Sequence, residues 1–112
     1  MARAALERAR REGYVVVIPT PVLTQVHRGG RDRAGVDRVV NAVDALLPTS
    51  AQIARRAGEL LAQSSTSDAV DAIVAAEALM SRPSLVLTSD QGDILRLIEG
   101  QPDAVAVRVI AI

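Results

Sequence analysis

The chain has 112 residues and a mass of 11.8 kDa, and its 13 basic side chains, all Arg, balance 13 acidic ones. This length predicts a single domain over residues 1–112, and 49% hydrophobic residues exclude a disordered or fibrous chain. The absence of Cys excludes disulfide scaffolds and thiolate metal sites, and a single His excludes multi-His metal centres. We find no apolar run of membrane-spanning length and no signal peptide, so we expect a cytoplasmic protein that does not bind membranes.

The first half of the chain alternates helix-forming and strand-forming segments. Helix formers, cap residues and apolar residues at helical spacing predict helices at residues 2–12, 20–27 and 32–43. Short β-branched or apolar runs predict strands at residues 14–18 and 44–47.

The second half continues the same alternation. Helical periodicity and N-cap residues predict helices at residues 50–63, 68–81 and 90–98, and β-branched runs predict strands at residues 84–88 and 104–112. Alternating strands and helices predict an α/β fold with a mainly parallel sheet. In such sheets ligands bind beyond the carboxyl ends of the strands, so functional residues are expected at those positions.

Two acids follow the strand predicted at residues 84–88. Asp90 comes at its carboxyl end, and Asp93 lies one turn into the next helix. Two carboxylates at this spacing can bind one hard cation through their oxygens. The alternative is structural, because Asp90 also fits a helix N-cap and Asp93 a first-turn acid that the helix dipole favours.

A second pair of acids begins the helix predicted at residues 68–81. Asp68 and Asp71 share one face of this helix, and Asp68 fits its N-cap. Asp71 lies in a segment of Ala, Val and Ile, where burying an unpaired carboxylate would cost free energy. We therefore expect Asp71 to lie at a pocket.

Three polar residues around the helix predicted at residues 20–27 are further candidates. Gln25 could bind a ligand or a water molecule at a metal, and its alternative is a position on the solvent side. Arg28 and Arg31 lie in a Gly-containing loop where their guanidinium groups suit phosphate oxygens, and the alternative is a solvated loop.

The order of four segments along the chain resembles the PIN-domain ribonucleases, in particular the VapC-type toxins of bacterial toxin–antitoxin pairs. The resemblance extends from about Val15 to the end, and its most specific parts are the segments around Asp71 and Asp90. The four segments are T-P-V-L-T-Q-V-H-R-G-G, A-R-R-A-G-E-L-L, S-D-A-V-D-A-I-V-A-A-E-A and L-V-L-T-S-D-Q-G-D-I-L-R-L.

This resemblance implies a three-layer α/β/α domain that cleaves RNA with Mg²⁺ or Mn²⁺. It implies that Asp71, Asp90 and Asp93 hold the metal, and that Gln25, where the family often has Glu, positions the reacting water. Arg28 and Arg31 would then contact RNA phosphate. The implied partners are RNA, a small antitoxin protein and a second copy of the chain in a homodimer.

The family usually begins with a strand that ends in its first metal-binding Asp, and we find no such strand before residues 2–12. Either the sequence starts after that strand or the domain is N-terminally shortened, and a shortened domain is expected to have lowered metal affinity. Two hypotheses remain. The chain is either a metal-dependent endoribonuclease or a catalytically impaired PIN remnant that acts as a binding or dimerisation module.

Overall fold

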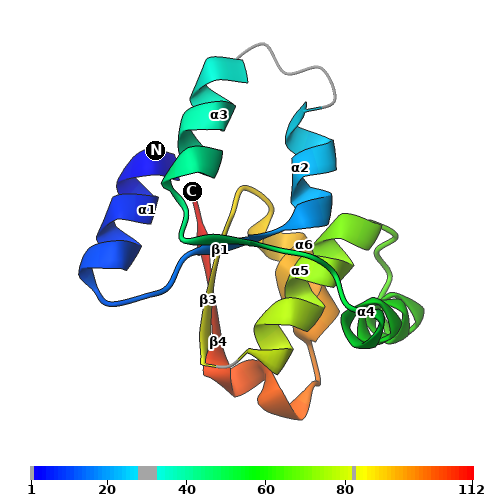
Figure 1. Cartoon of the computed structure of the whole chain (residues 1–112). Helices are drawn as coiled ribbons and strands as arrows, with labels where there is room; N and C mark the ends of the chain where they lie inside the picture. Colours follow the sequence, from blue (N-terminus) through cyan, green and yellow to red (C-terminus); the bar gives the residue numbers. More distant parts are fainter. Residues whose placement is uncertain (1, 28–32, 82) are drawn as a thin grey trace. The chain divides into compact units, whose positions relative to one another are not determined.

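Helices and short parallel strands alternate along the computed structural model, which describes residues 2–27, 33–81 and 83–112 (Figure 1). The chain divides into two units, Met1–Pro48 and Thr49–Ile112. The predicted α/β class is confirmed, whereas the single domain over the whole chain stays a prediction. None of the described helices combines the length and the apolar character that crossing a bilayer requires.

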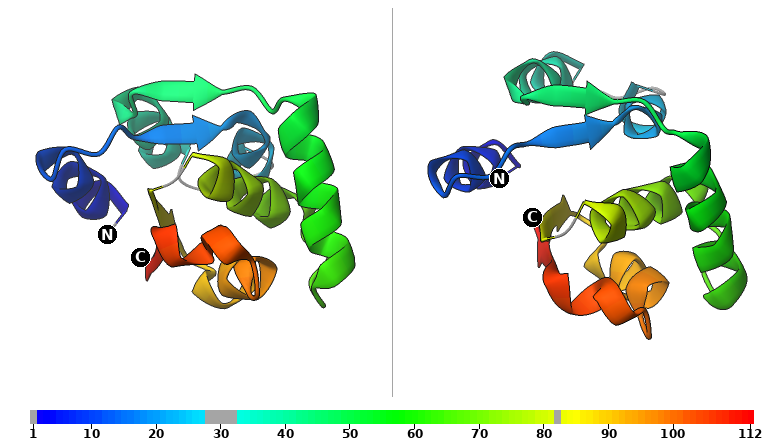
Figure 2. Two further views of the ribbon diagram at one scale, coloured as in Figure 1. Left: turned by 90° about the horizontal axis from the view of Figure 1, so that it is seen from below. Right: turned by 60° about the horizontal axis from the view of Figure 1, so that its bottom comes forward.

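In its described residues, the first unit contains two three-residue strands that pair with each other, and three helices (Figure 2). Its elements are α1 (Ala2–Arg11), β1 (Val17–Pro19), α2 (Thr20–His27), α3 (Arg33–Ala42) and β2 (Ala45–Leu47). The two strands run parallel, with Val17 opposite Ala45 and Pro19 opposite Leu47. A parallel connection needs a crossover of a dozen or more residues, and the segment containing α2 and α3 provides it.

Strand β1 begins at Val17, so the strand predicted from Tyr14 starts three residues too early. The Tyr14 N–H donates to Ala9 O at 3.0 Å, which completes the end of α1. The Val16 N–H donates to the carboxylate Oδ2 of Asp44 at 2.8 Å, and the Asp44 N–H donates back to Val16 O at 2.8 Å. The side chain of Asp44 therefore takes the N–H of Val16 that a neighbouring strand would otherwise bind, and the pairing of β1 with β2 begins one residue later, at Val17.

The second unit contains four helical segments and a second pair of parallel strands. Its elements are α4 (Ala51–Gln63), α5 (Ala69–Met80), β3 (Ser84–Thr88), α6 (Gln91–Ile98), the 3₁₀ helix η1 (Pro102–Ala106) and β4 (Val107–Ala111). Strands β3 and β4 pair in parallel from Ser84 opposite Val107 to Thr88 opposite Ala111. Their shared direction places both carboxyl ends at one edge, from which the chain leads into α6.

Strand β4 is shorter than predicted, because the residues before Val107 form η1. Pro102 lacks an N–H and suits the first turn of a helix. The Ala104 N–H donates to Gln101 O at 3.1 Å, and the Val107 N–H donates to Ala104 O, so the backbone bonds locally instead of along a strand. The side chain of Val105 is 90% exposed, which is inconsistent with the buried strand that its β-branched neighbours predicted.

Helix α5 packs against α4, α6 and β3 at the centre of the second unit. Ala72, Ala75 and Ala76 are fully buried on it, and such small side chains let neighbouring elements approach closely. Helix α4 begins where the Ile53 N–H donates to the Oγ of Ser50 at 3.1 Å, so the predicted Ser50 cap is confirmed. The core comprises Ile53, Ala57, Leu60, Ala72, Ala75, Ala76, Ala78, Leu79, Val86, Ile94, Leu97, Ile98 and Val107.

Candidate metal centre

The first turn of α5 is fixed by Asp68. Its Oδ1 accepts hydrogen bonds from the N–H groups of Val70 at 2.9 Å and Asp71 at 3.0 Å, which satisfies two donors at the helix start. The Asp68 N–H donates in turn to the Oγ1 of Thr66 at 3.4 Å. The predicted cap is confirmed, and it holds the backbone of Asp71 in place.

Asp90 stands at the N-cap position of α6, but its side chain makes no capping hydrogen bond. The turn is held instead by Thr88, whose Oγ1 accepts from the Asp90 N–H at 2.9 Å. Capping therefore does not explain the carboxylate of Asp90. Asp93 lies in the first turn of α6, where its Oδ1 is 3.0 Å from the Nη1 of Arg96.

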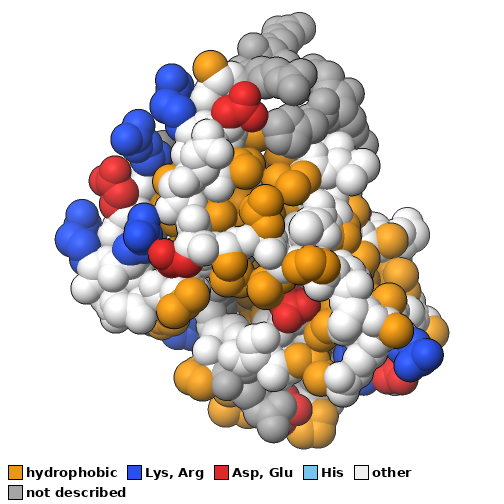
Figure 3. All heavy atoms as spheres, viewed as in Figure 1, with side chains coloured by type: hydrophobic (Ala, Val, Ile, Leu, Met, Phe, Trp, Pro, Cys, Tyr) orange, Lys and Arg blue, Asp and Glu red, His pale blue; other side chains and the backbone are white. Residues whose placement is uncertain are grey.

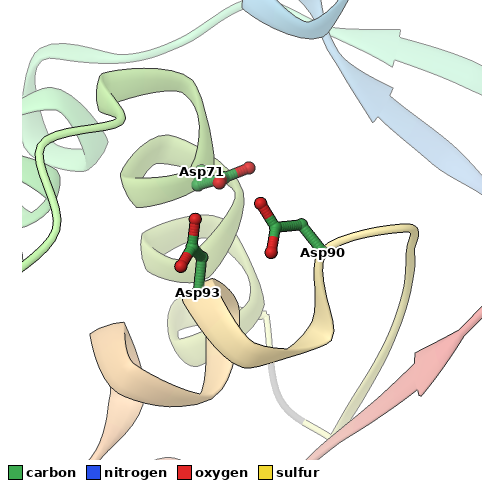
Figure 4. A group of neighbouring side chains, drawn as sticks. All are labelled: Asp71, Asp90 and Asp93. Carbon is green, nitrogen blue, oxygen red and sulfur yellow. The ribbon is translucent and has the colours of Figure 1, made fainter.

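Asp71, Asp90 and Asp93 converge in space, and we call them the acidic cluster. One carboxylate oxygen from each residue lies within 4.8 Å of the others. Figure 4 shows the three side chains pointing toward one another, with Asp71 on α5, Asp90 at the end of the loop before α6 and Asp93 on α6. Asp71 and Asp93 are half-buried, and Asp90 is exposed, so the cluster opens to solvent.

The proximity of like charges changes the protonation of the cluster. Burial and the negative charges of Asp68, Asp90 and Asp93 raise the pKa of Asp71 from 3.8 to about 6. A hydrogen bond with Asp90, burial and the charge of Asp90 raise the pKa of Asp93, which the cation of Arg96 opposes. The carboxylates thus repel one another, and a bound cation would relieve that repulsion.

The donor set suits a hard divalent cation. Three carboxylates offer oxygen and neither nitrogen nor sulfur, and Mg²⁺ and Mn²⁺ prefer oxygen ligands. One open side leaves room for water and for a substrate oxygen, since Mg²⁺ keeps several waters when it is bound by a few carboxylates. The residues of the acidic cluster therefore fit such a cation in number, chemistry and spacing.

The remaining predicted site residues lie outside the second unit. Gln25 is half-buried on α2 in the first unit, and its role with a reacting water stays a prediction. Arg28 and Arg31 lie outside the described residues.

Two features near the acidic cluster were not predicted from the sequence. Arg96 neutralises part of the charge of Asp93, and the Oγ1 of Thr88 holds the turn before α6. Arg96 follows Asp93 by three positions, a spacing that brings side chains together on a helix and could have indicated the pair. The T-S-D sequence likewise allows the Thr88 hydroxyl to bond the backbone two residues later.

Comparison of the chain with models of protein families, with curated proteins and with solved structures finds no match. What can be inferred about the function of the chain therefore rests on the geometry of the acidic cluster and on the motifs in the sequence.

Replacing Asp68 by Ala should lower the free energy of unfolding by about 1 kcal/mol, because the first turn of α5 loses its cap. Asp68→Asn keeps an acceptor oxygen and should lose less than half of that. Urea denaturation of the two variants measures the difference. Equal destabilisation by Ala and Asn would contradict the capping role.

Proposed function

We propose that the chain is a PIN-type endoribonuclease that uses Mg²⁺ or Mn²⁺ and serves as the toxin of a bacterial toxin–antitoxin pair. The observation that carries the proposal is the convergence of Asp71, Asp90 and Asp93 within 4.8 Å. These are the three acids at which the sequence resembles that family. The failure of Asp90 to cap α6 adds support, since its carboxylate makes no capping hydrogen bond at the helix start.

Asp71, Asp90 and Asp93 would hold the cation in this proposal. When bound, the cation lowers the pKa of water and neutralises charge on the scissile phosphate. The reaction is hydrolysis, in which a water oxygen bonds to phosphorus as the bond from phosphorus to the leaving ribose oxygen breaks. Gln25 is proposed to orient the attacking water, and Arg28 and Arg31 are proposed to contact RNA phosphate.

The proposal extends to the fold and the partners. It assigns the chain a three-layer α/β/α PIN fold, of which the alternating helices and two parallel strand pairs are the described elements. It places the protein in the cytoplasm, where a small antitoxin would inhibit it, and as a homodimer.

Incubation of the purified chain with a labelled single-stranded RNA tests the activity. We expect internal cleavage with Mg²⁺ or Mn²⁺ and none with EDTA. Absence of cleavage with either metal would contradict the proposal. The chain would then be better described as a PIN remnant that acts as a binding or dimerisation module.

A further inference from the structure

The zero net charge of the chain conceals opposite charges in its two units. Residues 1–48 carry eight Arg against five acids, and residues 49–112 carry five Arg against eight acids. The acidic cluster belongs to the negative unit, which repels a polyanion such as RNA. An enzyme that cleaves RNA at this cluster needs a positive surface to attract its substrate, and the first unit is where that surface should lie.

Helix α1 presents most of its positive charge on one side. Leu6 and Ala9 are each 5% exposed and define its buried face. At 100° per residue, Arg8 and Arg11 project from the opposite side and Arg3 from the flank, and all three are exposed. Figure 3 shows blue Arg side chains over the region of α1, with red acidic side chains between them. We call these three residues the basic face of α1.

Arg10, the remaining Arg of α1, has a structural role. Its Nη1 donates to Ala42 O at 3.0 Å, and its Nη2 lies 3.2 Å from the Oδ1 of Asp44. Asp44 also accepts the Val16 N–H, so Arg10 ties α1 to the start of the strand pair. This connection holds the helix while its other Arg side chains extend into solvent.

The basic face is only weakly bound to neighbouring acids. Arg3 lies 3.5 Å from Glu7 and Arg8 lies 3.2 Å from Glu12, and all four side chains are largely exposed. Exposed pairs of this kind contribute roughly 0–1 kcal/mol, so a phosphate can displace the carboxylate at little cost. Arg11 makes no ion pair within the part of the chain that the structure describes.

We propose that the basic face of α1 binds the phosphate backbone of the RNA substrate, an inference that rests on the proposed nuclease function. The three guanidinium groups are spread over about 12 Å of helix length and can contact successive phosphates of one strand. Arg suits this role because its planar group makes paired hydrogen bonds to phosphate oxygens. A membrane surface does not fit, since the apolar side of α1 is already buried.

RNA binding measured in EDTA tests the inference without any cleavage. We expect Arg8→Gln/Arg11→Gln to weaken binding of a labelled single-stranded RNA about tenfold at 0.1 M salt, and to lower the salt slope by about 1.4. The matched control is Arg55→Gln/Arg108→Gln, which removes the same charge from exposed positions of the second unit. This control should bind within about twofold of the native chain. Fluorescence anisotropy between about 50 and 200 mM salt gives both quantities.

The acids beside the basic face provide a test in the opposite direction. Glu7→Gln/Glu12→Gln should strengthen RNA binding several-fold, because Arg3 and Arg8 lose their competing partners. Glu59→Gln/Glu99→Gln in the second unit is the control and should have less effect. Gln is a good helix former at Glu7 and Glu59, the two positions that lie within helices, and thermal unfolding of both variants checks that the fold is retained.

Two outcomes would overturn the inference. Unchanged affinity and salt slope in Arg8→Gln/Arg11→Gln would do so, and would favour an acidic protein as the partner of this surface. An equal loss in the Arg55→Gln/Arg108→Gln control would show that only total charge matters. Binding is measured without metal and so does not depend on cleavage. If the chain binds RNA through α1 but never cleaves it, that result contradicts the proposed nuclease function and leaves RNA binding by α1 standing.

Discussion

Replacing Asp90 by Asn should reduce Mn²⁺-dependent RNA cleavage at least about 100-fold. Asp90 supplies one of three converging carboxylates, and loss of even an outer partner of a metal site costs 10–100-fold. The substitution should leave the fold intact, since Asp90 is exposed and its side chain does not cap α6. Asp71→Asn should cause a loss of similar size. Initial cleavage rates at saturating Mn²⁺ measure both effects.

Glu99→Gln is the matched control for the cleavage experiment. Glu99 is an exposed acid that follows α6 in the same unit and does not belong to the acidic cluster. Its neutralisation changes the net charge of the chain as Asp90→Asn does and should leave the rate within about twofold of native. Full activity of Asp90→Asn would contradict the role of the cluster.

Asp71→Asn should stabilise the metal-free protein near neutral pH, although it removes a proposed functional residue. Folding raises the pKa of Asp71 from 3.8 to about 6, so the folded state binds its proton more tightly than the unfolded state. The contribution of Asp71 to stability is then complete below about pH 3.8 and is lost as the pH rises through about 6. Above about pH 7 the charged carboxylate opposes folding, and Asn removes that charge.

The size of this effect is limited by solvent. A shift of about two pKa units corresponds to at most about 3 kcal/mol, and screening of the half-exposed group reduces the expected gain to about 1 kcal/mol. Divalent metal should make the native chain more stable than Asp71→Asn, which reverses their order in EDTA. Mn²⁺ at 100 times its Kd would stabilise the native chain by about 2.7 kcal/mol and would stabilise Asp71→Asn much less.

Unfolding by urea in EDTA and in Mn²⁺, at pH values on both sides of about 6, measures all of these effects. A variant that is less stable than the native chain in EDTA above about pH 7 would contradict the electrostatic account. Equal stabilisation of both proteins by Mn²⁺ would contradict the role of Asp71 as a ligand.

Local patterns predicted most of the secondary structure, because caps and periodicity act within a few residues. Ser50 and Asp68 begin their helices as expected. The errors occurred where distant residues or local turns override β-branched runs. Asp44 takes the N–H of Val16 from far along the chain, and Pro102 begins a 3₁₀ helix where a strand was predicted.

The residue pattern predicted two separate pairs of acids, Asp90 with Asp93 and Asp68 with Asp71, and only the family resemblance grouped Asp71 with Asp90 and Asp93. The sequence left open whether Asp90 caps α6 or binds a metal, because an Asp at the start of a helix suits both roles. Only the structure shows that Thr88 holds the turn and leaves the Asp90 carboxylate directed toward Asp71.

A calorimetric titration of Mn²⁺ tests most directly the claim that the acidic cluster holds a divalent cation. We expect saturable binding to the native chain and a loss of that binding in Asp71→Asn/Asp90→Asn, with Glu99→Gln behaving as native. Absence of binding to the native chain, or equal binding to the double variant, would contradict it.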